Sequence, residues 1–343
     1  MFHHRIWAGA ALICMIAAGF IVSPASAEGT TLRYSNWLPP SYVFHKDIML
    51  PWMEAVEKAT DGRVKVDVSP KVIGTVAGQY DVAADGLADI TFVLPGYTPG
   101  RFTAIEGLEG AFLGDDPQQR CPADWAAYDK FLAPIDYFKE VHIIGIYCAN
   151  SGQFSMTKQA INSLDDLKGL KIRTPAPAVT QALELLGAVP VSKPASEVYE
   201  LANGGIIDGA VFPYDSVVGF KLDGVLKTIT RVPGGVSTTV VVIAMNKGVW
   251  DKLSDADKKA IDSVSGAALA KRAGDALKVA QDQAIDVLKN GGATFVTMSP
   301  DTLSALKKAI EPVRQEWIAK AMEAGLSDPA AMLEFVENYK VAN

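Results

Sequence analysis

The stretch INSLDDLKGLKIRTP, residues 161–175, decides the fold. A short apolar strand in it ends at Arg173, because Thr174-Pro175 stops the strand. In open α/β sheets, ligands bind beyond the carboxyl ends of the strands. Arg173 is therefore placed to hold an anionic ligand through two parallel hydrogen bonds. The alternative is a surface ion pair between Arg173 and the neighbouring Asp165 or Asp166.

Helices and strands alternate after this stretch. Residues 176–186 are predicted to form an amphipathic helix, and the strand AVPV follows at residues 188–191. A helix over residues 195–205, which glycines end, leads to a strand over residues 206–213. Residues 237–246, STTVVVIAMN, form a further β-branched strand.

The chain before residue 150 shows the same alternation. Residues 30–35 and 63–68 are predicted to be strands. A helix is predicted between them, with Pro51 either in its first turn or at a kink. Two apolar strands follow, over residues 90–94 and 141–152. Strands that alternate with helices in this way indicate a mixed α/β fold.

The longest predicted element is a helix from Asp255 to Lys289. Ser254 caps its start, and Asn290-Gly291-Gly292 ends it. A helix of this length measures about 52 Å, whereas a small domain is about 30 Å across. We therefore expect the helix to span two domains, with Gly266 and Gly274 as points where it could bend. A chain of 343 residues is also longer than one core usually supports.

The first 27 residues have the pattern of a cleaved export signal. MFHHR is a short basic start, residues 6–22 are apolar, and Ala25-Ser26-Ala27 is a small-residue cleavage pattern. We expect cleavage after Ala27 and a location in the periplasm. The alternative is an uncleaved anchor helix of about the same length.

The chain after residue 27 is acidic. Without Arg5 it has 31 Lys and Arg against 39 Asp and Glu, a net charge of −8. This charge argues against nucleic acid and anionic membrane surfaces as partners. His45 and His142 are its only histidines and lack metal-ligand spacing, and no G-x-S-x-G motif is present. We therefore expect no metal, no cofactor and no catalytic triad.

Cys121 and Cys148 are the two cysteines that follow the export signal. In an oxidising compartment such a pair can form a disulfide. Two unpaired thiols are the alternative that the sequence leaves open.

Six motifs occur in order along the chain. They are EKATDGRVKVDVSP, GLADITFVLPG, AINSLDDLKGLKIRTP, LLGAVPV, SEVYELANGGIIDGAVFP and MNKGVWDKLSDADKKAI. In this order they resemble the substrate-binding subunits of TRAP (tripartite ATP-independent periplasmic) transporters, the DctP-type family. The resemblance covers essentially the whole chain after residue 27. It implies a two-lobed, periplasmic-binding-protein-like α/β fold with mixed sheets, hinge strands and one long helix that spans both lobes.

The resemblance also implies lobe boundaries and a mode of action. Residues 28–149 with about 238–275 would form the first lobe, and residues 150–237 with about 276–343 the second, with the ligand cleft between them. The lobes would close by a hinge over an organic acid whose carboxylate pairs with Arg173. The protein would then deliver this acid to the integral-membrane TRAP permease. It would be a binding protein and not an enzyme, and we expect a monomer.

The sequence departs from the family pattern at three places. Phe212 stands where the family usually has the asparagine of its DG-x-x-N-P motif, and Ala202-Asn203 replaces a leucine-glutamine pair. Gln153 stands where some members have a second arginine. The changes at residues 212 and 153 remove polarity and charge. They favour an aromatic or branched monocarboxylate over a sugar acid or a dicarboxylate.

Five aromatic residues follow predicted strands or lie in the adjoining loops, where they could surround the body of the ligand. Asn150 and Gln153 could orient the ligand by hydrogen bonds. A single aromatic residue is more often part of a core, so the prediction depends on their meeting at one place. The aromatic residues are Trp37, Tyr97, Phe154, Phe212 and Tyr214.

Three other classes of protein are alternatives to a TRAP substrate-binding subunit. A binding protein of an ABC transporter and a chemoreceptor-type sensory protein would have the same kind of cleft. An exported α/β enzyme would need a nucleophile–base pair or a set of metal ligands, and the sequence after residue 27 offers neither.

Overall fold

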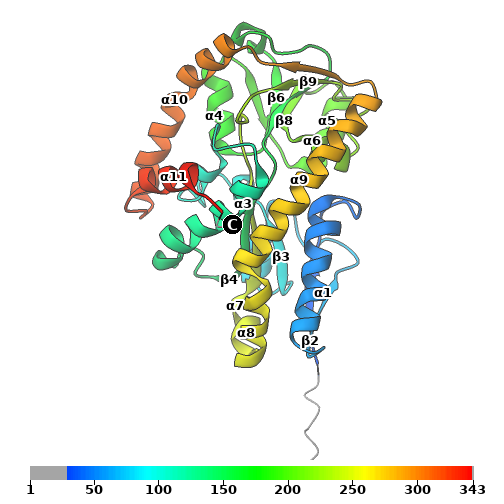
Figure 1. Ribbon diagram of the computed structural model, residues 1–343, viewed down its shortest axis with the longest axis vertical. Coiled ribbons are helices and arrows are strands. Elements are labelled where there is room, and N and C mark those ends of the chain that lie inside the picture. Colours follow the sequence, from blue (N-terminus) through cyan, green and yellow to red (C-terminus); the bar gives the residue numbers. More distant parts are fainter. Residues whose placement is uncertain (1–28, 342–343) are drawn as a thin grey trace, which may run out of the picture.

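The computed structural model describes residues 29–341, which form two α/β lobes (Figure 1). The two-lobed mixed α/β fold is the one predicted from the sequence. The predicted export signal, residues 1–27, lies outside the described residues. Between residues 29 and 341, no helix has both the length and the apolar character needed to cross a membrane.

The first lobe is built on a five-stranded mixed sheet with the strand order β2-β1-β3-β10-β4. β1 pairs in parallel with β2 and β3, and β10 runs antiparallel to β3 and β4. β10 comes from late in the chain, so the chain returns to the first lobe. The strands are β1 (Thr30–Ser35), β2 (Val64–Val68), β3 (Ile90–Val93), β4 (Val141–Cys148) and β10 (Val240–Asn246).

The second lobe is built on a six-stranded mixed sheet with the strand order β11-β9-β5-β8-β6-β7. β5 runs antiparallel to β8 and β9, while β6 pairs in parallel with β7 and β8. The strands are β5 (Gln153–Met156), β6 (Lys171–Thr174), β7 (Val189–Ser192), β8 (Gly209–Phe212), β9 (Thr228–Arg231) and β11 (Thr294–Thr297).

Helices cover both sheets. The α-helices are α1 (Leu50–Ala59), α2 (Gln79–Ala84), α3 (Pro117–Ala127), α4 (Pro177–Leu185), α5 (Val198–Asn203), α6 (Tyr214–Gly219), α7 (Lys247–Lys252), α8 (Asp255–Val264), α9 (Gly266–Asn290), α10 (Pro300–Glu323) and α11 (Pro329–Asn338). The short 3₁₀ and π segments are η1 (Phe44–Met49), η2 (Pro95–Tyr97), η3 (Glu106–Glu109), η4 (Tyr128–Leu132), η5 (Ala133–Ile135), η6 (Leu164–Leu167) and η7 (Ala195–Glu197).

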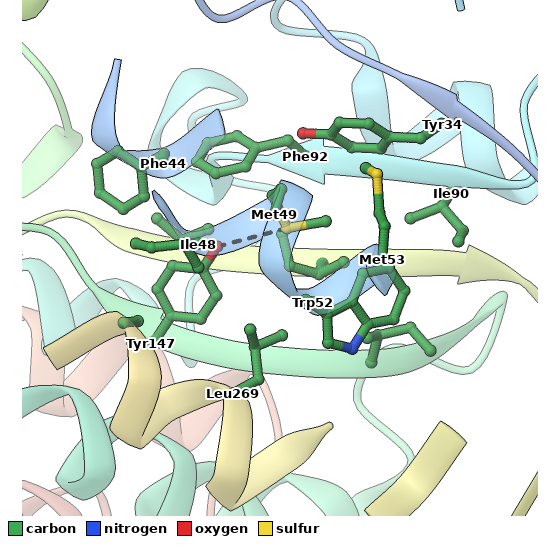
Figure 2. Packing of buried hydrophobic residues seen from close by; sticks show 14 of the residues in the cluster. Tyr34, Phe44, Ile48, Met49, Trp52, Met53, Ile90, Phe92, Tyr147 and Leu269 are labelled. Atoms are coloured by element: carbon green, nitrogen blue, oxygen red, sulfur yellow. Dashed lines mark hydrogen bonds between the residues drawn. The ribbon is translucent and has the colours of Figure 1, made fainter. Parts of the chain in front are cut away.

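The core of the first lobe lies between η1 and α1 on one side and strands of the sheet on the other. Pro51 is in the first turn of α1, which continues directly from the π segment η1. Met49 and Trp52 are fully buried. Figure 2 shows Met49 beside Tyr147, whose hydroxyl lies 3.9 Å from the Met49 sulfur.

Two extended segments and two helices, α9 and α10, connect the lobes. The link from β4 to β5 pairs with the link from β9 to β10, through a bridge between Gly152 and Ser237. The amide of Ala149 also donates to the Thr239 carbonyl at 2.7 Å. The paired segments are the hinge strands that the resemblance implied.

The long helix differs from its prediction. It is divided at Ser265 into α8 and α9, because Gly266 has a φ of +53°. A Cβ atom on Gly266 would lie 2.6 Å from the Trp125 ring. α9, with 25 residues and a length of about 38 Å, still spans the molecule. It packs on α3 and β4 in the first lobe and on α6 in the second (Figure 1).

The C-terminal part also differs from the predicted boundary, which assigned residues 276–343 to the second lobe. Leu306 and Ile310, in the first half of α10, are buried in the core of the second lobe. Trp317, in its second half, is buried in the core of the first lobe together with residues of α11. α10 thus carries apolar side chains for both lobes, and α11 belongs to the first.

Cys121 of α3 and Cys148 of β4 form a disulfide, with their Cα atoms 4.6 Å apart. Both residues are fully buried. Of the two alternatives that the sequence left open, the structure has the bridge. It ties α3 to the end of the strand that leads into the hinge.

Candidate ligand-binding site

Arg173 is buried at the end of β6, with 2% of its surface exposed. Its Nε donates to the Lys193 carbonyl at 2.7 Å, and its Nη1 donates to the Val211 carbonyl at 3.4 Å. Its Nη2 donates to the Tyr97 hydroxyl of the first lobe at 3.1 Å. The guanidinium also lies over the Phe212 ring, 5.1 Å from the ring centre. These contacts fix its orientation.

The guanidinium has no carboxylate partner within 4 Å in residues 29–341. Asp165 pairs with Lys168, and Asp166 accepts from the amides of Asn162 and Ser163, so the surface ion pair considered from the sequence does not form. Burial lowers the pKa of Arg173, while Tyr97 opposes this shift. An arginine nevertheless stays charged in proteins. A buried positive charge without an anion is costly.

The contacts of Arg173 leave N–H donors for a carboxylate. A guanidinium has five N–H groups. Three of them are engaged, one on each nitrogen. One N–H on Nη1 and one on Nη2 remain, and each can donate to a carboxylate oxygen.

A cavity of about 50 Å³ lies beside Arg173, between the two lobes. Its wall is mostly apolar, with seven aromatic residues, and carries few polar groups. The rings come from both lobes, so the cavity exists only where the lobes meet. Its aromatic residues are Trp37, Tyr42, Phe44, Phe92, Tyr97, Phe212 and Phe220, and its hydroxyl residues are Ser216, Ser237 and Thr239.

Four of the eight residues predicted for the site line this cavity: Trp37, Tyr97, Arg173 and Phe212. The other four do not. Phe154 points into the core of the second lobe, and the Tyr214 ring packs against Phe295 on β11.

Gln153 and Asn150 are occupied by other partners. The Gln153 side chain accepts from the Val232 amide at 2.6 Å and so connects β5 to the hinge segment. The Asn150 side chain donates to Asp215 at 2.8 Å and to the Leu277 carbonyl at 3.1 Å. Both residues are buried and support the hinge; neither lines the cavity.

The sequence prediction missed four of the aromatic residues that line the cavity. Phe92 is in a fully buried strand, and Phe44 begins a buried helical segment, so both have the pattern of core residues. Tyr42 follows Pro39-Pro40, in the loop that begins near Trp37, and Phe220 follows the end of α6. The loop position of Tyr42 is the one signal that could have identified it.

A larger cavity, of about 250 Å³, lies between α4, α10 and α11. Its wall includes Phe112 and Trp317. Of its cations, Lys307 is exposed and Arg314 is paired with Glu337. Because it has no buried and unpaired cation, it gives weaker grounds for binding an anion than the cavity at Arg173.

No group of three or more His, Cys, Asp and Glu side chains could hold a metal ion within the described part of the chain. The chemistry of the site is therefore that of one guanidinium, a few hydroxyl groups and aromatic rings.

Comparisons with known proteins agree with this geometry. Residues 34–321 match the family described as "Bacterial extracellular solute-binding protein, family 7", DctP. A TRAP solute-binding protein of Bordetella bronchiseptica, solved with bound mandelate, is 34% identical, with a TM-score of 0.86 over 90% of this chain and 98% of that one.

Two further relatives cover similar shares of the chain. A marine metagenome TRAP solute-binding protein, solved with 3-hydroxybenzoate, is 30% identical, with a TM-score of 0.84 over 90% of this chain and 97% of that one. The outer membrane transporter protein TsaT of Comamonas testosteroni is 28% identical over 93% of this chain and 94% of its own. The family and the solved structures are solute-binding proteins and not enzymes. This chain therefore belongs to family 7 of the bacterial extracellular solute-binding proteins, the DctP-type family, and is a TRAP solute-binding protein.

Proposed function

We propose that this protein captures an aromatic monocarboxylate in the periplasm and delivers it to a membrane TRAP permease. The observation that carries the proposal is the buried Arg173, with two unused N–H groups beside an aromatic cavity. A carboxylate would supply the missing negative charge and accept both N–H groups. The rings would bury the apolar body of the ligand.

Three observations favour an aromatic acid over a sugar acid or a branched acid. Phe212 lies under the guanidinium at a position where the family usually has an asparagine. The relatives at 34% and 30% identity were solved with mandelate and 3-hydroxybenzoate. Ser237 and Thr239 place hydroxyl groups on an otherwise apolar wall, where they could meet a hydroxyl group of the ligand.

The mechanism is capture without chemistry. In the open form the carboxylate would reach Arg173 from water, and the lobes would then rotate about the two paired hinge segments. Closure would bring Tyr97 and Trp37 of the first lobe against the ligand on the second. The closed surface would be the one that the permease recognises. Removal of residues 1–27 and a monomeric state belong to the same proposal.

Titration calorimetry tests the proposal directly. Benzoate and (R)-mandelate should bind at micromolar concentration, which needs about 8 kcal/mol, while glucuronate and succinate should bind far more weakly. Arg173→Ala should weaken binding by about 30- to 4000-fold, since losing one member of a buried charge pair costs about 2–5 kcal/mol.

Arg231→Ala is the matched control, because Arg231 is an exposed arginine of the same lobe, 3.7 Å from Asp115. It should bind benzoate as the wild type does. Tight binding of glucuronate alone would contradict the choice of ligand. Unchanged binding of benzoate by Arg173→Ala would contradict the role of the guanidinium.

A further inference from the structure

Tyr42 connects the two lobes by direct contacts between protein groups, and its ring also lines the cavity beside Arg173. It precedes η1 in the first lobe, and its hydroxyl reaches α6 in the second. The hydroxyl donates to an Asp215 carboxylate oxygen at 3.2 Å and accepts from the Ser216 hydroxyl at 2.6 Å. All three side chains are buried.

The ring of Tyr42 rests directly on the backbone of Gly219. A Cβ atom at Gly219 would lie 2.8 Å from Cε2 of the ring and nearer still to Cδ2. Contacts this short do not occur between real side chains, so Gly219 is the residue type that lets the tyrosine approach. The Phe220 ring packs on the same tyrosine, with the ring centres 5.0 Å apart.

The partner carboxylate of Tyr42 is held by the hinge. Asp215 accepts at 2.8 Å from Asn150, which lies between β4 and β5. Asn150 also donates to the Leu277 carbonyl of α9 at 3.1 Å. One hydrogen-bond network therefore joins a loop of the first lobe, the hinge, the long helix and α6. It can form only when the lobes have the arrangement seen here.

Neither Asp215 nor Gly219 lines the cavity beside Arg173. A change at Gly219 therefore acts on the contact between the lobes through the Tyr42 ring, which itself lines the cavity. The compaction on adding benzoate separates an effect on this contact from a direct effect of Tyr42 on the ligand. When only the closed form holds the ligand fully, the apparent dissociation constant varies inversely with the closed fraction.

We propose that the packing of Tyr42 on Gly219, with the hydroxyl on Asp215 and Ser216, is a closure contact that sets the affinity for the ligand through the position of the lobes. The inference rests on the proposed capture of an aromatic acid. It makes Gly219 a positioning residue, which acts through Tyr42 and the geometry of the closed form.

Gly219→Ala tests this inference, and Gly224→Ala is its control. A Cβ atom at Gly224, five residues away in the same lobe, would meet nothing within 4 Å. Alanine at position 219 suits a helix better than glycine, so the second lobe itself should not weaken. We expect benzoate and (R)-mandelate to bind Gly219→Ala about tenfold more weakly or worse, as overpacking a well-packed contact predicts. Gly224→Ala should bind both acids with the affinity of the wild type.

A double-mutant cycle separates the closure contact from an unrelated effect of the alanine. Tyr42→Ala removes the ring, so Gly219→Ala should have no further effect in that background. The loss of affinity in Gly219→Ala should come mainly from faster dissociation, measured by stopped flow. Small-angle X-ray scattering should show that this variant compacts less on adding benzoate than the wild type does. If Gly219→Ala alone does not fold, the double variant, which has room for the methyl group, still measures the contact.

The outcomes distinguish the two proposals. A wild type that binds neither acid overturns the proposed function, and the closure contact with it. A wild type that binds while Gly219→Ala and Gly224→Ala have equal affinities overturns the closure contact alone. A tenfold loss that persists in the Tyr42→Ala background also overturns it, because the methyl group would then act elsewhere.

Discussion

Tyr97 couples Arg173, the proposed anchor of the ligand, to the opposite lobe. Its hydroxyl oxygen accepts from Arg173 Nη2 at 3.1 Å and from the Ala195 amide at 2.9 Å. Tyr97→Phe removes this acceptor and leaves two buried donors without it. A hydrogen bond that involves a charged group contributes about 1.5–3 kcal/mol, so we expect benzoate to bind about 10- to 150-fold more weakly by calorimetry. Tyr199→Phe, at an exposed tyrosine, should have no effect.

Asp215 should make the free energy of unfolding of the protein depend on pH. Burial raises the pKa of Asp215 to about 6 from its ordinary value of 3.8, against the effect of its hydrogen bonds with Asn150 and Tyr42. Between these values the folded protein binds more protons than the unfolded chain, so this group's contribution to stability is present below pH 4 and is lost as the pH rises through 6.

Asp215→Asn should remove the loss of stability that the wild type shows as the pH rises. From pH 4 to above pH 6, urea unfolding should show the variant gaining up to about 3 kcal/mol on the wild type, since one pKa unit corresponds to about 1.4 kcal/mol. Asp124, whose pKa burial also raises to about 6, is present in both proteins and cancels in the comparison. A profile parallel to that of the wild type would mean that Asp215 keeps an ordinary pKa. Asp286→Asn, at an exposed site, is the control.

Arg173 could be singled out from the sequence, whereas the choice among aromatic residues could not. Its position rests on a strand end and a proline, both local signals. Phe154 and Phe212 are on paired neighbouring strands, β5 and β8, and all four residues of each strand are buried. A strand buried on both faces shows no alternation of polar and apolar residues. Which ring faces the other lobe therefore depends on the pleat and on the distant chain that covers it.

At the scale of elements, the disulfide is the clearest device for stability. It joins α3 to the end of β4 across 27 residues of sequence. The chain-entropy model assigns a loop of this length about 3–4 kcal/mol. The free energy of unfolding of the double variant Cys121→Ala/Cys148→Ala, measured with a chemical denaturant, should be lower by about that much. Dithiothreitol should lower the stability of the wild type and leave that of the variant unchanged. Equal stability of the two proteins without reductant would show that the bridge contributes little.

The break between α8 and α9 could not be predicted from the local sequence pattern. Apolar residues keep a helical spacing through residues 255–290, so the pattern predicts one helix. The break depends on Gly266 fitting beside Trp125, a residue about 140 positions earlier in the chain. Capping signals, by contrast, are local. Ser254 accepts from the Asp257 amide and starts α8 as predicted.

At the scale of the whole molecule, the proposed capture requires the lobes to move relative to each other and yet remain one folded unit. α9 and α10 both carry buried side chains for the two lobes. The sequence indicated this role for α9 through its length. For α10 it did not, because each half of that helix has an ordinary apolar stripe, and only the fold shows that the two stripes face different cores.

Trp317 attaches α10 to the first lobe and gives the prediction that separates stability from binding. Its indole N–H donates to the Thr103 carbonyl at 2.8 Å, and its ring packs on Gly107. Trp317→Ala should cost about 3–5 kcal/mol in urea unfolding, as for other buried tryptophans. Because Trp317 lies outside the cavity at Arg173, the folded variant should bind benzoate with the affinity of the wild type. Weaker binding at unchanged stability would instead mean that α10 takes part in closing the lobes.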